Sequence, residues 1–197
     1  MNKAAKTKQF ILEKVAPIFN KNGYYATSMS DITSATSLTK GAIYGNFKNK
    51  EELALASFDY NVEFILGKIK QILIEIDSPL EKLFALTNFY RDYYVHRINF
   101  GGCPILNVGV DANFTNPKLF ERVKEVMLSI QKSIANVITQ GQIKNEIKKD
   151  IDSLVYGTRI FSLIEGAVFT SVIFQEEKYL FDMMNHLDHI INTELKV

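Results

Sequence analysis

The stretch GYYATSMSDI at residues 23–32, followed by LTKGAIYGNFKNKEEL at residues 38–53, decides the fold of the N-terminal part of this chain. Thr27-Ser28 and Thr39 carry side chains that cap helix N-termini, and each precedes a short run of helical spacing. The second of these runs predicts a helix over residues 40–47. Because a longer helix is predicted before them, the three helices and their short turns predict a helix-turn-helix.

This stretch closely resembles the DNA-binding domain of TetR-family repressors, without a gap, over roughly residues 7–55. A glycine, a threonine, the Asp31-Ile32 pair, the Lys40-Gly41 pair, a tyrosine, a phenylalanine and a lysine fall in register with the family pattern. The resemblance implies an all-α homodimer. Its N-terminal helix-turn-helix would bind DNA, and its larger C-terminal domain would bind an effector and dimerise.

The residues of this stretch also suit DNA contact on chemical grounds. Apolar residues close a small core against the first helix, which leaves Lys40 and Tyr44 on the outer side, where they can reach phosphates or base edges. Gly41 lets the backbone approach a groove wall, and the free amides of a helix N-terminus suit a phosphate. The predicted DNA-binding residues are Thr27, Ser28, Thr39, Lys40, Gly41, Tyr44, Asn46 and Lys50.

Two positions depart from the family pattern. Ser37 stands where the family usually has glycine, in the turn before the third helix, so this serine must adopt a left-handed conformation or the chain must avoid one. Gly45 stands where a bulky aromatic residue or histidine is common, which removes one base-reading side chain. Base specificity is therefore expected to depend on Thr39, Lys40 and backbone contacts.

The rest of the chain predicts long helices. Only four prolines and ten glycines interrupt 197 residues, and strand signals are weak. Pro17 predicts a local kink in the first helix, while Ser78-Pro79 and Asn116-Pro117 mark later helix starts. We predict an all-α fold of about nine helices, with a DNA-binding domain over residues 1–50 and an effector-binding and dimerisation domain over residues 51–197.

Charge is unevenly distributed, although the net charge of the chain is only +1. Residues 1–50 hold eight lysines and two acidic residues, a net charge of +6, so the remainder carries −5. A basic head on an acidic body is typical of a polyanion-binding module attached to another domain.

Three features predict a cytoplasmic protein without a membrane segment. The lysine-rich N-terminus lacks the apolar core and cleavage site of a signal peptide. The most apolar run, Ile160 to Phe174, is interrupted by Glu165 and does not reach membrane-spanning length. The single cysteine cannot form an internal disulfide, which suits a reducing compartment.

The last two predicted helices suit a dimer interface. By resemblance, they pack against their symmetry mates as a four-helix bundle. The last helix has an apolar seam at heptad-like spacing, and the helix before it is apolar nearly all round and must be covered on two sides. Two core helices of a monomer are the alternative. The predicted interface residues are Phe169, Leu180, Met183, Met184, Leu187 and Ile191.

By resemblance, the predicted fourth, fifth and seventh helices enclose a cavity for a small-molecule effector. Aromatic residues are frequent there, which favours an apolar or aromatic effector over a strongly charged one. Ordinary core packing is the alternative for each of these residues. The predicted ligand-binding residues are Phe64, Phe89, Tyr90, Tyr93 and Cys103.

Cys103 also suggests an alternative function. It occupies the N-cap position before Pro104, where free amides and the helix dipole favour a thiolate. Gly-Cys before an apolar helix resembles a subset of TetR-like regulators that sense electrophiles or oxidants through a cysteine there. The alternatives for Cys103 are therefore a thiol-based sensor and a small residue that packs in a tight corner.

No pattern in the sequence indicates catalysis. A Ser/His/Asp set, an HExxH motif, a phosphate-binding loop and a paired-cysteine zinc motif are all absent. We predict a ligand-responsive transcriptional regulator of palindromic operator DNA, released by a small effector, with no enzymatic activity, cofactor or metal. An enzyme and a non-sensing architectural DNA binder are the weaker alternatives.

Overall fold

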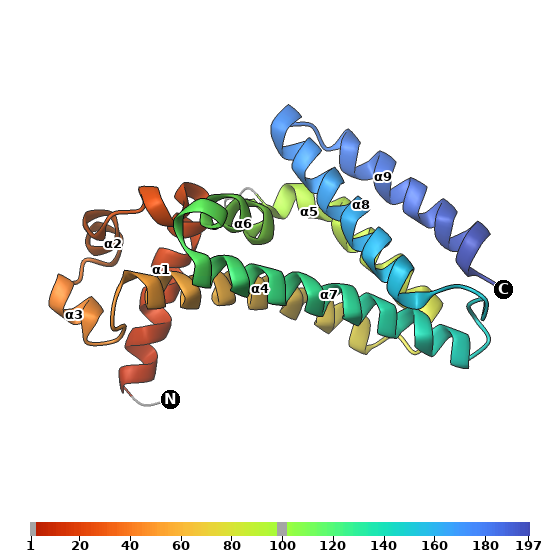
Figure 1. Cartoon of the computed structure of the whole chain (residues 1–197), viewed down its shortest axis with the longest axis horizontal. Coiled ribbons are helices and arrows are strands. Elements are labelled where there is room, and N and C mark those ends of the chain that lie inside the picture. The colour runs from red at the N-terminus through yellow and green to blue at the C-terminus, as the bar shows by residue number, and fades with distance from the viewer. Residues whose placement is uncertain (1–2, 98–101) are drawn as a thin grey trace. The chain divides into compact units, whose positions relative to one another are not determined.

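The computed structural model describes residues 3–97 and 102–197, which form nine α-helices and one short π-helical turn (Figure 1). The all-α fold of about nine helices is confirmed. The elements are α1 (Lys3–Ala26), α2 (Met29–Thr36), α3 (Lys40–Tyr44), α4 (Lys50–Ile74), α5 (Pro79–Arg97), α6 (Pro104–Thr115), α7 (Pro117–Ile143), α8 (Ser153–Phe174), α9 (Lys178–Ile190) and η2 (Ile191–Leu195).

The described residues fall into two compact units. The first holds residues 3–65 and 102–124, and the second holds residues 66–97 and 125–197. The first unit therefore contains α1, α2, α3 and α6, whereas α4 and α7 each begin in the first unit and end in the second. The predicted division after residue 50 stays a prediction.

The helix-turn-helix is built on a small apolar core in the first unit. Ile32 of α2 and Ile43 of α3 are fully buried, and Phe47 beyond α3 is nearly so. Ile11 and Val15, four residues apart on α1, are also fully buried. The spacing of these apolar residues is what gives each helix one inward face and one outward face.

Local capping explains why the short helices begin and end where they do. Ser28 Oγ accepts a hydrogen bond from the Asp31 amide at 3.2 Å, and the Asp31 carboxylate accepts one from the Ser28 amide at 2.7 Å, a complete capping box for α2. Ser37 ends α2 in the left-handed conformation, with φ 56° and ψ 24°. Helix α3 ends at Tyr44 rather than at the predicted Phe47, because the chain turns after Gly45.

Helix α1 contains Pro17 and departs from helical φ and ψ at Gly23. Gly23 has φ 81° and ψ 173°, while Pro17 lies inside the helix without such a break. A Cβ on Gly23 would lie 2.7 Å from Cγ of Asp111 in α6. The Tyr24 amide donates a hydrogen bond to the same carboxylate at 2.6 Å. Glycine is therefore required here by its positive φ and by the approach of α6.

Two asparagine side chains, buried Asn20 and half-buried Asn107, add to the contact between α1 and α6. Asn20 Nδ2 donates to the Gly102 carbonyl at 2.9 Å. Asn107 Nδ2 of α6 donates to the Asn20 carbonyl at 3.0 Å. Together with Asp111, these bonds fix α6 to the bend of α1, and thus to the helix-turn-helix.

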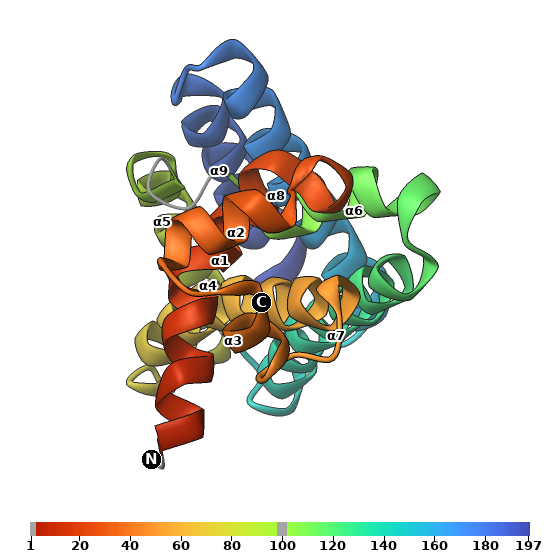
Figure 2. The same cartoon turned by 90° about the vertical axis from the view of Figure 1, so that its left-hand side faces the viewer.

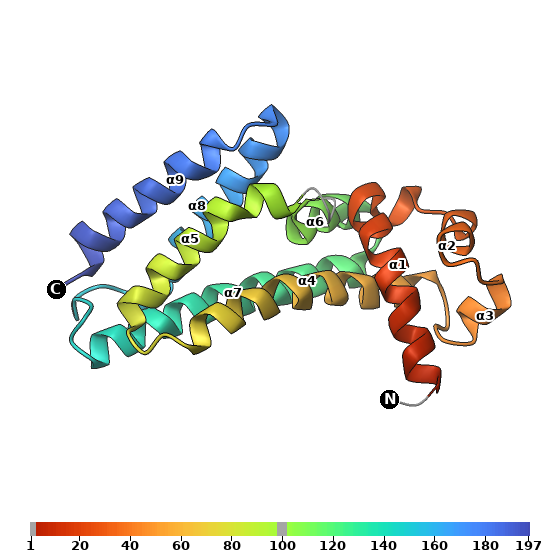
Figure 3. The ribbon, with the colours of Figure 1, turned by 180° about the vertical axis from the view of Figure 1, so that it is seen from behind.

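In the second unit, α8 packs against α9 and α5, and α5 also packs against α9 (Figure 3). Gly157 of α8 allows a close approach to α7, because a Cβ there would lie 2.7 Å from the Gln131 carbonyl and 3.0 Å from Ala135 Cβ. Arg91 of α5 forms an ion pair with Asp188 of α9, so the second unit is held by both apolar and polar contacts.

Helix α8 extends the apolar run Ile160 to Phe174 back to Ser153, and it is the one described helix that is long and apolar enough to cross a membrane by composition, contrary to the expectation from the shorter run. The same composition is expected of a helix in the core of a protein. Ile160, Phe161 and Ile164 of α8 are buried in the folded chain, which favours the core interpretation.

Candidate DNA interface and apolar cavity

Helix α3 presents an exposed Lys–Tyr face. Thr39 is its N-cap, with Oγ1 accepting a hydrogen bond from the Ala42 amide at 3.2 Å. Lys40 and Tyr44, one turn apart, are both exposed, and Lys40 Nζ lies 5.9 Å from the Tyr44 ring centroid. Figure 2 turns α1, α2 and α3 toward the viewer. The Lys40 ammonium group and the Tyr44 hydroxyl on this face lie outside the buried core, where another molecule can reach them.

Gly41 lies on the same exposed part of α3, and nothing in the protein requires it to be glycine. A Cβ there would meet only Thr39 Oγ1, at 3.9 Å, an ordinary van der Waals distance. Since glycine weakens a helix, its presence at an open position suits a close approach by another molecule.

Two of the predicted DNA-binding side chains face inward. Thr27 is 0% exposed, and its hydroxyl donates to the Gly23 carbonyl at 2.7 Å, so its side chain is not available to DNA. Asn46 is half-buried, and its Nδ2 donates to the Ala42 carbonyl at 2.9 Å. Both side chains stabilise turns that position α2 and α3.

Ser28 and Lys50 lie at helix starts, as predicted. Ser28 is exposed, and its hydroxyl is engaged in the capping box of α2. Lys50 begins α4, with Nζ 4.5 Å from the Tyr24 ring centroid. Burial lowers the pKa of the Lys50 ammonium group from its ordinary value, while the carboxylates of Asp111 and Asp31 oppose part of that shift. Lys50 is therefore a partly desolvated cation that a phosphate would stabilise.

One exposed aromatic residue near this surface was missed from the sequence. Tyr25 is 79% exposed at the end of α1, close in sequence to the Ser28 cap. Apolar spacing could not show that Tyr25 is exposed, because the chain leaves helical geometry at Gly23, two residues before it. Tyr25 is an additional candidate for contact with a DNA backbone.

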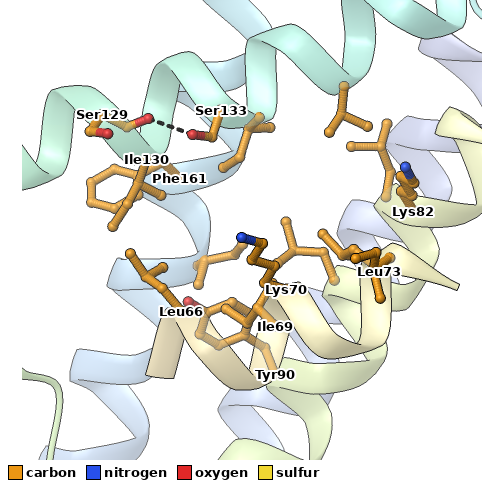
Figure 4. Close-up of a pocket in the computed structure, with 16 residues that line it drawn as sticks. Leu66, Ile69, Lys70, Leu73, Lys82, Tyr90, Ser129, Ile130, Ser133 and Phe161 are labelled. Carbon is orange, nitrogen blue, oxygen red and sulfur yellow. Dashed lines mark hydrogen bonds between the residues drawn. The ribbon is translucent and has the colours of Figure 1, made fainter. Parts of the chain in front are cut away.

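An apolar cavity of about 440 Å³ lies within the second unit (Figure 4). Successive turns of α4, α5 and α7 form its walls, and α8 contributes Phe161 and Ile164. The sequence carries a signal for the α4 wall, because Leu66, Ile69 and Leu73 recur at the spacing of one helix face. The lining residues are Leu66, Ile69, Lys70, Leu73, Ile74, Lys82, Leu83, Leu86, Tyr90, Ser129, Ile130, Ser133, Ile134, Val137, Phe161 and Ile164.

Only one of the predicted ligand-binding residues lines this cavity. That residue is Tyr90, whose ring packs edge-on to Phe89, with centroids 5.3 Å apart. Phe89 and Tyr93 pack beside Tyr90 in an aromatic cluster, and Phe64 belongs to the first unit. These three predicted residues therefore do not line this cavity.

Cys103 does not line the cavity either, and it is only 7% exposed. It is the N-cap of α6, as predicted, but its side chain makes no capping hydrogen bond. A buried thiol conflicts with the accessible thiolate that an electrophile sensor requires. The structure and relatives give no support to the thiol-sensing alternative, and packing explains this residue.

The predicted dimer seam on α9 is buried inside the chain. Leu180, Met184 and Leu187 are each 0% exposed, and Ile191 is 1% exposed, so the prediction that these side chains contact a partner is wrong. Met183 is half-buried. Phe169 of α8 is 53% exposed and remains a candidate for the interface.

A short capped helix with an exposed Lys–Tyr face, held on a buried three-helix core, is the arrangement of a helix-turn-helix DNA-binding protein. Two family models match the chain. The model described as "Bacterial regulatory proteins, tetR family" matches residues 11–57, and "Tetracyclin repressor-like, C-terminal domain" matches residues 79–187. The second match alone covers more than half of the chain, which therefore belongs to the TetR family of transcriptional regulators.

Solved structures agree with this assignment. A TetR transcriptional regulator from Chloroflexus aurantiacus is 32% identical, with all of both chains covered and a TM-score of 0.93. Two more distant structures share the fold. FadR from Bacillus subtilis, in complex with stearoyl-CoA, is 20% identical, with 94% of this chain and 97% of that chain covered and a TM-score of 0.76. A regulator from Saccharomonospora viridis, in complex with choline, is 21% identical, with coverages of 98% and 99% and a TM-score of 0.81.

Proposed function

We propose that this protein is an effector-responsive repressor, a homodimer that binds a palindromic operator and leaves it when a small molecule occupies the cavity of the second unit. The observation that carries the proposal is the outward face of α3, where Lys40, Gly41 and Tyr44 are exposed on a helix whose opposite side is buried. The protein would act by binding, without catalysis, in the cytoplasm where its operator lies.

The DNA side of the proposal rests on α3 and the helix starts around it. In helix-turn-helix dimers the two recognition helices enter successive major grooves about 34–36 Å apart. Lys40 and Tyr44 would contact phosphates or base edges. The amides at the N-termini of α2 and α4 would bind phosphates near Ser28 and Lys50. Thr39 and the open backbone at Gly41 complete the face.

The dimer is proposed to form through the outer face of α8. Members of this family usually form homodimers. Phe169 and Ile173, one turn apart on α8, are 53% and 60% exposed, and Phe181 of α9 is also exposed. Large apolar side chains at helical spacing in contact with water are typical of a surface that another subunit covers.

Effector binding is proposed for the apolar cavity. A cavity of about 440 Å³ with mostly apolar walls and a few polar groups is typical of sites for small ligands. Two distant structures of this fold hold small molecules, stearoyl-CoA in one and choline in the other. An effector that binds one conformation of the dimer more tightly would shift the population away from the DNA-binding state.

The proposal is tested by selecting an operator from a randomised duplex pool and measuring affinity by fluorescence anisotropy. Lys40→Ala should weaken binding and lower the slope of log affinity against log salt by about one unit per lost phosphate contact. Tyr44→Phe should weaken binding by about fivefold, the effect of one lost hydrogen bond. Lys132→Ala, which removes an exposed lysine of α7 outside the interface, is the control of equal charge change.

Both variants must keep the helicity and oligomeric state of the wild type. If Lys40→Ala and Tyr44→Phe both bind the operator as tightly as the wild type, α3 is not part of the DNA interface. Selection of no sequence from the pool would contradict operator binding altogether. If an operator is bound but no small molecule releases it, the non-sensing architectural role is the better description.

A further inference from the structure

The cavity of the second unit has charged groups of one sign only. Five of its lining residues are polar: Lys70, Lys82, Tyr90, Ser129 and Ser133. Among the described residues that line it there is no carboxylate, so the charged side chains of the lining are those of the two lysines. Neither lysine forms an ion pair with another described residue.

The lining residues of the cavity differ in exposure. Leu83, Phe161 and Ile164 are buried, whereas Lys70 is exposed and Lys82 half-buried. Leu66 and Ile74 of α4 are exposed as well. Figure 4 shows the Lys70 nitrogen directed into the space that the labelled residues enclose. The cavity therefore combines buried apolar side chains with ammonium groups that water can reach.

Two serines of α7 also line the cavity. Ser129 and Ser133 lie one helical turn apart and are exposed. The Ser133 hydroxyl donates to the Ser129 carbonyl at 2.8 Å, so its oxygen is held at the edge of the cavity, and the Ser129 hydroxyl can donate to a ligand. Hydroxyl and ammonium donors together suit an acceptor that is negatively charged.

We propose that the effector is an amphipathic anion, an apolar chain or ring that carries one carboxylate or phosphate group. The apolar body would fill the space between α4, α5 and α7, and the anionic group would accept hydrogen bonds from Lys70 and Lys82. A cationic amphiphile would be repelled by both lysines, and a neutral one would gain nothing from them. This inference rests on the proposed function, whose effector it narrows from apolar molecules to apolar anions.

The test compares four probes with the same ten-carbon chain and different head groups: decanoate, decyl phosphate, 1-decanol and decylamine. Binding to the full-length dimer is measured by calorimetry without DNA, below the micelle-forming concentration of each probe. At least one of the anions should bind about tenfold or more tightly than 1-decanol, the gain expected from a charge-assisted contact, and decylamine should bind most weakly. The tighter of decanoate and decyl phosphate identifies the head group.

Variants assign the head group to its site. The double variant Lys70→Gln/Lys82→Gln should lose about tenfold in affinity for the anion and none for 1-decanol. Lys132→Gln, on the same helix as Ser129 and Ser133 but outside the lining, should match the wild type. Equal affinity of the anion for the double variant and the wild type would overturn the assignment of the head group to Lys70 and Lys82.

The probes also separate this inference from the proposed function. Tighter binding of 1-decanol or decylamine than of both anions, or no binding of any probe, would overturn the ligand class and leave operator binding intact. If an anion binds with the predicted lysine dependence but does not release the selected operator, the ligand class stands and the repressor function fails.

Discussion

Gly41→Ala separates the stability of α3 from its contact with DNA. Inside the protein the added methyl group has room, because its nearest neighbour would be Thr39 Oγ1 at 3.9 Å. Alanine in place of glycine in a helix stabilises by about 0.5–1 kcal/mol, which corresponds to a rise in Tm of roughly 1–4 °C for a chain of this size. The folded protein should therefore become slightly more stable.

Operator affinity should change in the opposite direction. If the backbone at Gly41 lies against the wall of the major groove, the methyl group overpacks that contact. Overpacking a close interface costs about 1–3 kcal/mol, so we expect a roughly five- to hundredfold weaker complex. The measurements are thermal unfolding by circular dichroism and fluorescence anisotropy with the selected operator.

The matched control is Gly67→Ala in α4, where a Cβ would meet nothing within 4 Å. It should raise Tm by a similar amount and leave operator affinity unchanged. Wild-type affinity in Gly41→Ala would refute a close approach of this part of α3 to DNA. A lower Tm in Gly41→Ala would mean that the packing around α3 differs from the structure.

Three further predictions concern the helices that support the sites. Ser28→Ala removes the capping box of α2 and should lower the free energy of unfolding by about 1 kcal/mol in urea titrations; wild-type stability would show that the cap is dispensable. Gly157→Ala should destabilise by about 1–3 kcal/mol, since its Cβ would lie 2.7 Å from the Gln131 carbonyl, and an unchanged Tm would contradict the close approach of α7 and α8. Hydrogen bonds from Ser78 and the Leu80 amide lower the pKa of Glu146 below its ordinary 4.5. The stability that the ionised Glu146 carboxylate adds to the folded protein is therefore present above the unfolded-state pKa and is lost as pH falls through the folded-state pKa. Glu146→Gln should therefore lower Tm at pH 7 and flatten the loss of stability below pH 4.5, and a Tm profile parallel to the wild type would contradict this.

The sequence was most informative where function depends on local geometry. A cap at Thr27-Ser28 and one at Thr39 follow from residue type and position, and the structure has Ser28 and Thr39 as the N-caps. The sequence left two conformations open for Ser37, and the structure has the left-handed one. The buried helix-turn-helix core also follows from apolar spacing. Thr27 was mistaken for a DNA contact because two adjacent hydroxyl residues can both cap a helix, and only the fold determines which one does.

Spacing alone could not identify what an apolar face contacts. Leu180, Met184 and Leu187 form a regular stripe whether it packs on α8 and α5 of the same chain or on a second subunit. The cavity of the second unit posed the same difficulty, because the aromatic residues Phe89 and Tyr93 pack beside Tyr90 but do not line it. Lys70 and Lys82 were not predicted to line a cavity, because a lysine within an apolar stripe is usually a solvated surface residue.

The contact between α6 and the bend of α1 bears on the construction of hybrid regulators. Asn107 and Asp111 of α6 bond to Asn20 and to the Tyr24 amide, and Asp111 fits only against a glycine at position 23. Suppose that residues 1–50 of this chain alone were joined to the rest of another regulator. The other regulator's α6 would then face this bend, and without an aspartate at the matching position the Tyr24 amide would lose its acceptor. We therefore expect a hybrid regulator to keep a stable DNA-binding domain only if α6 is transferred together with the helix-turn-helix, although the two are separated in sequence.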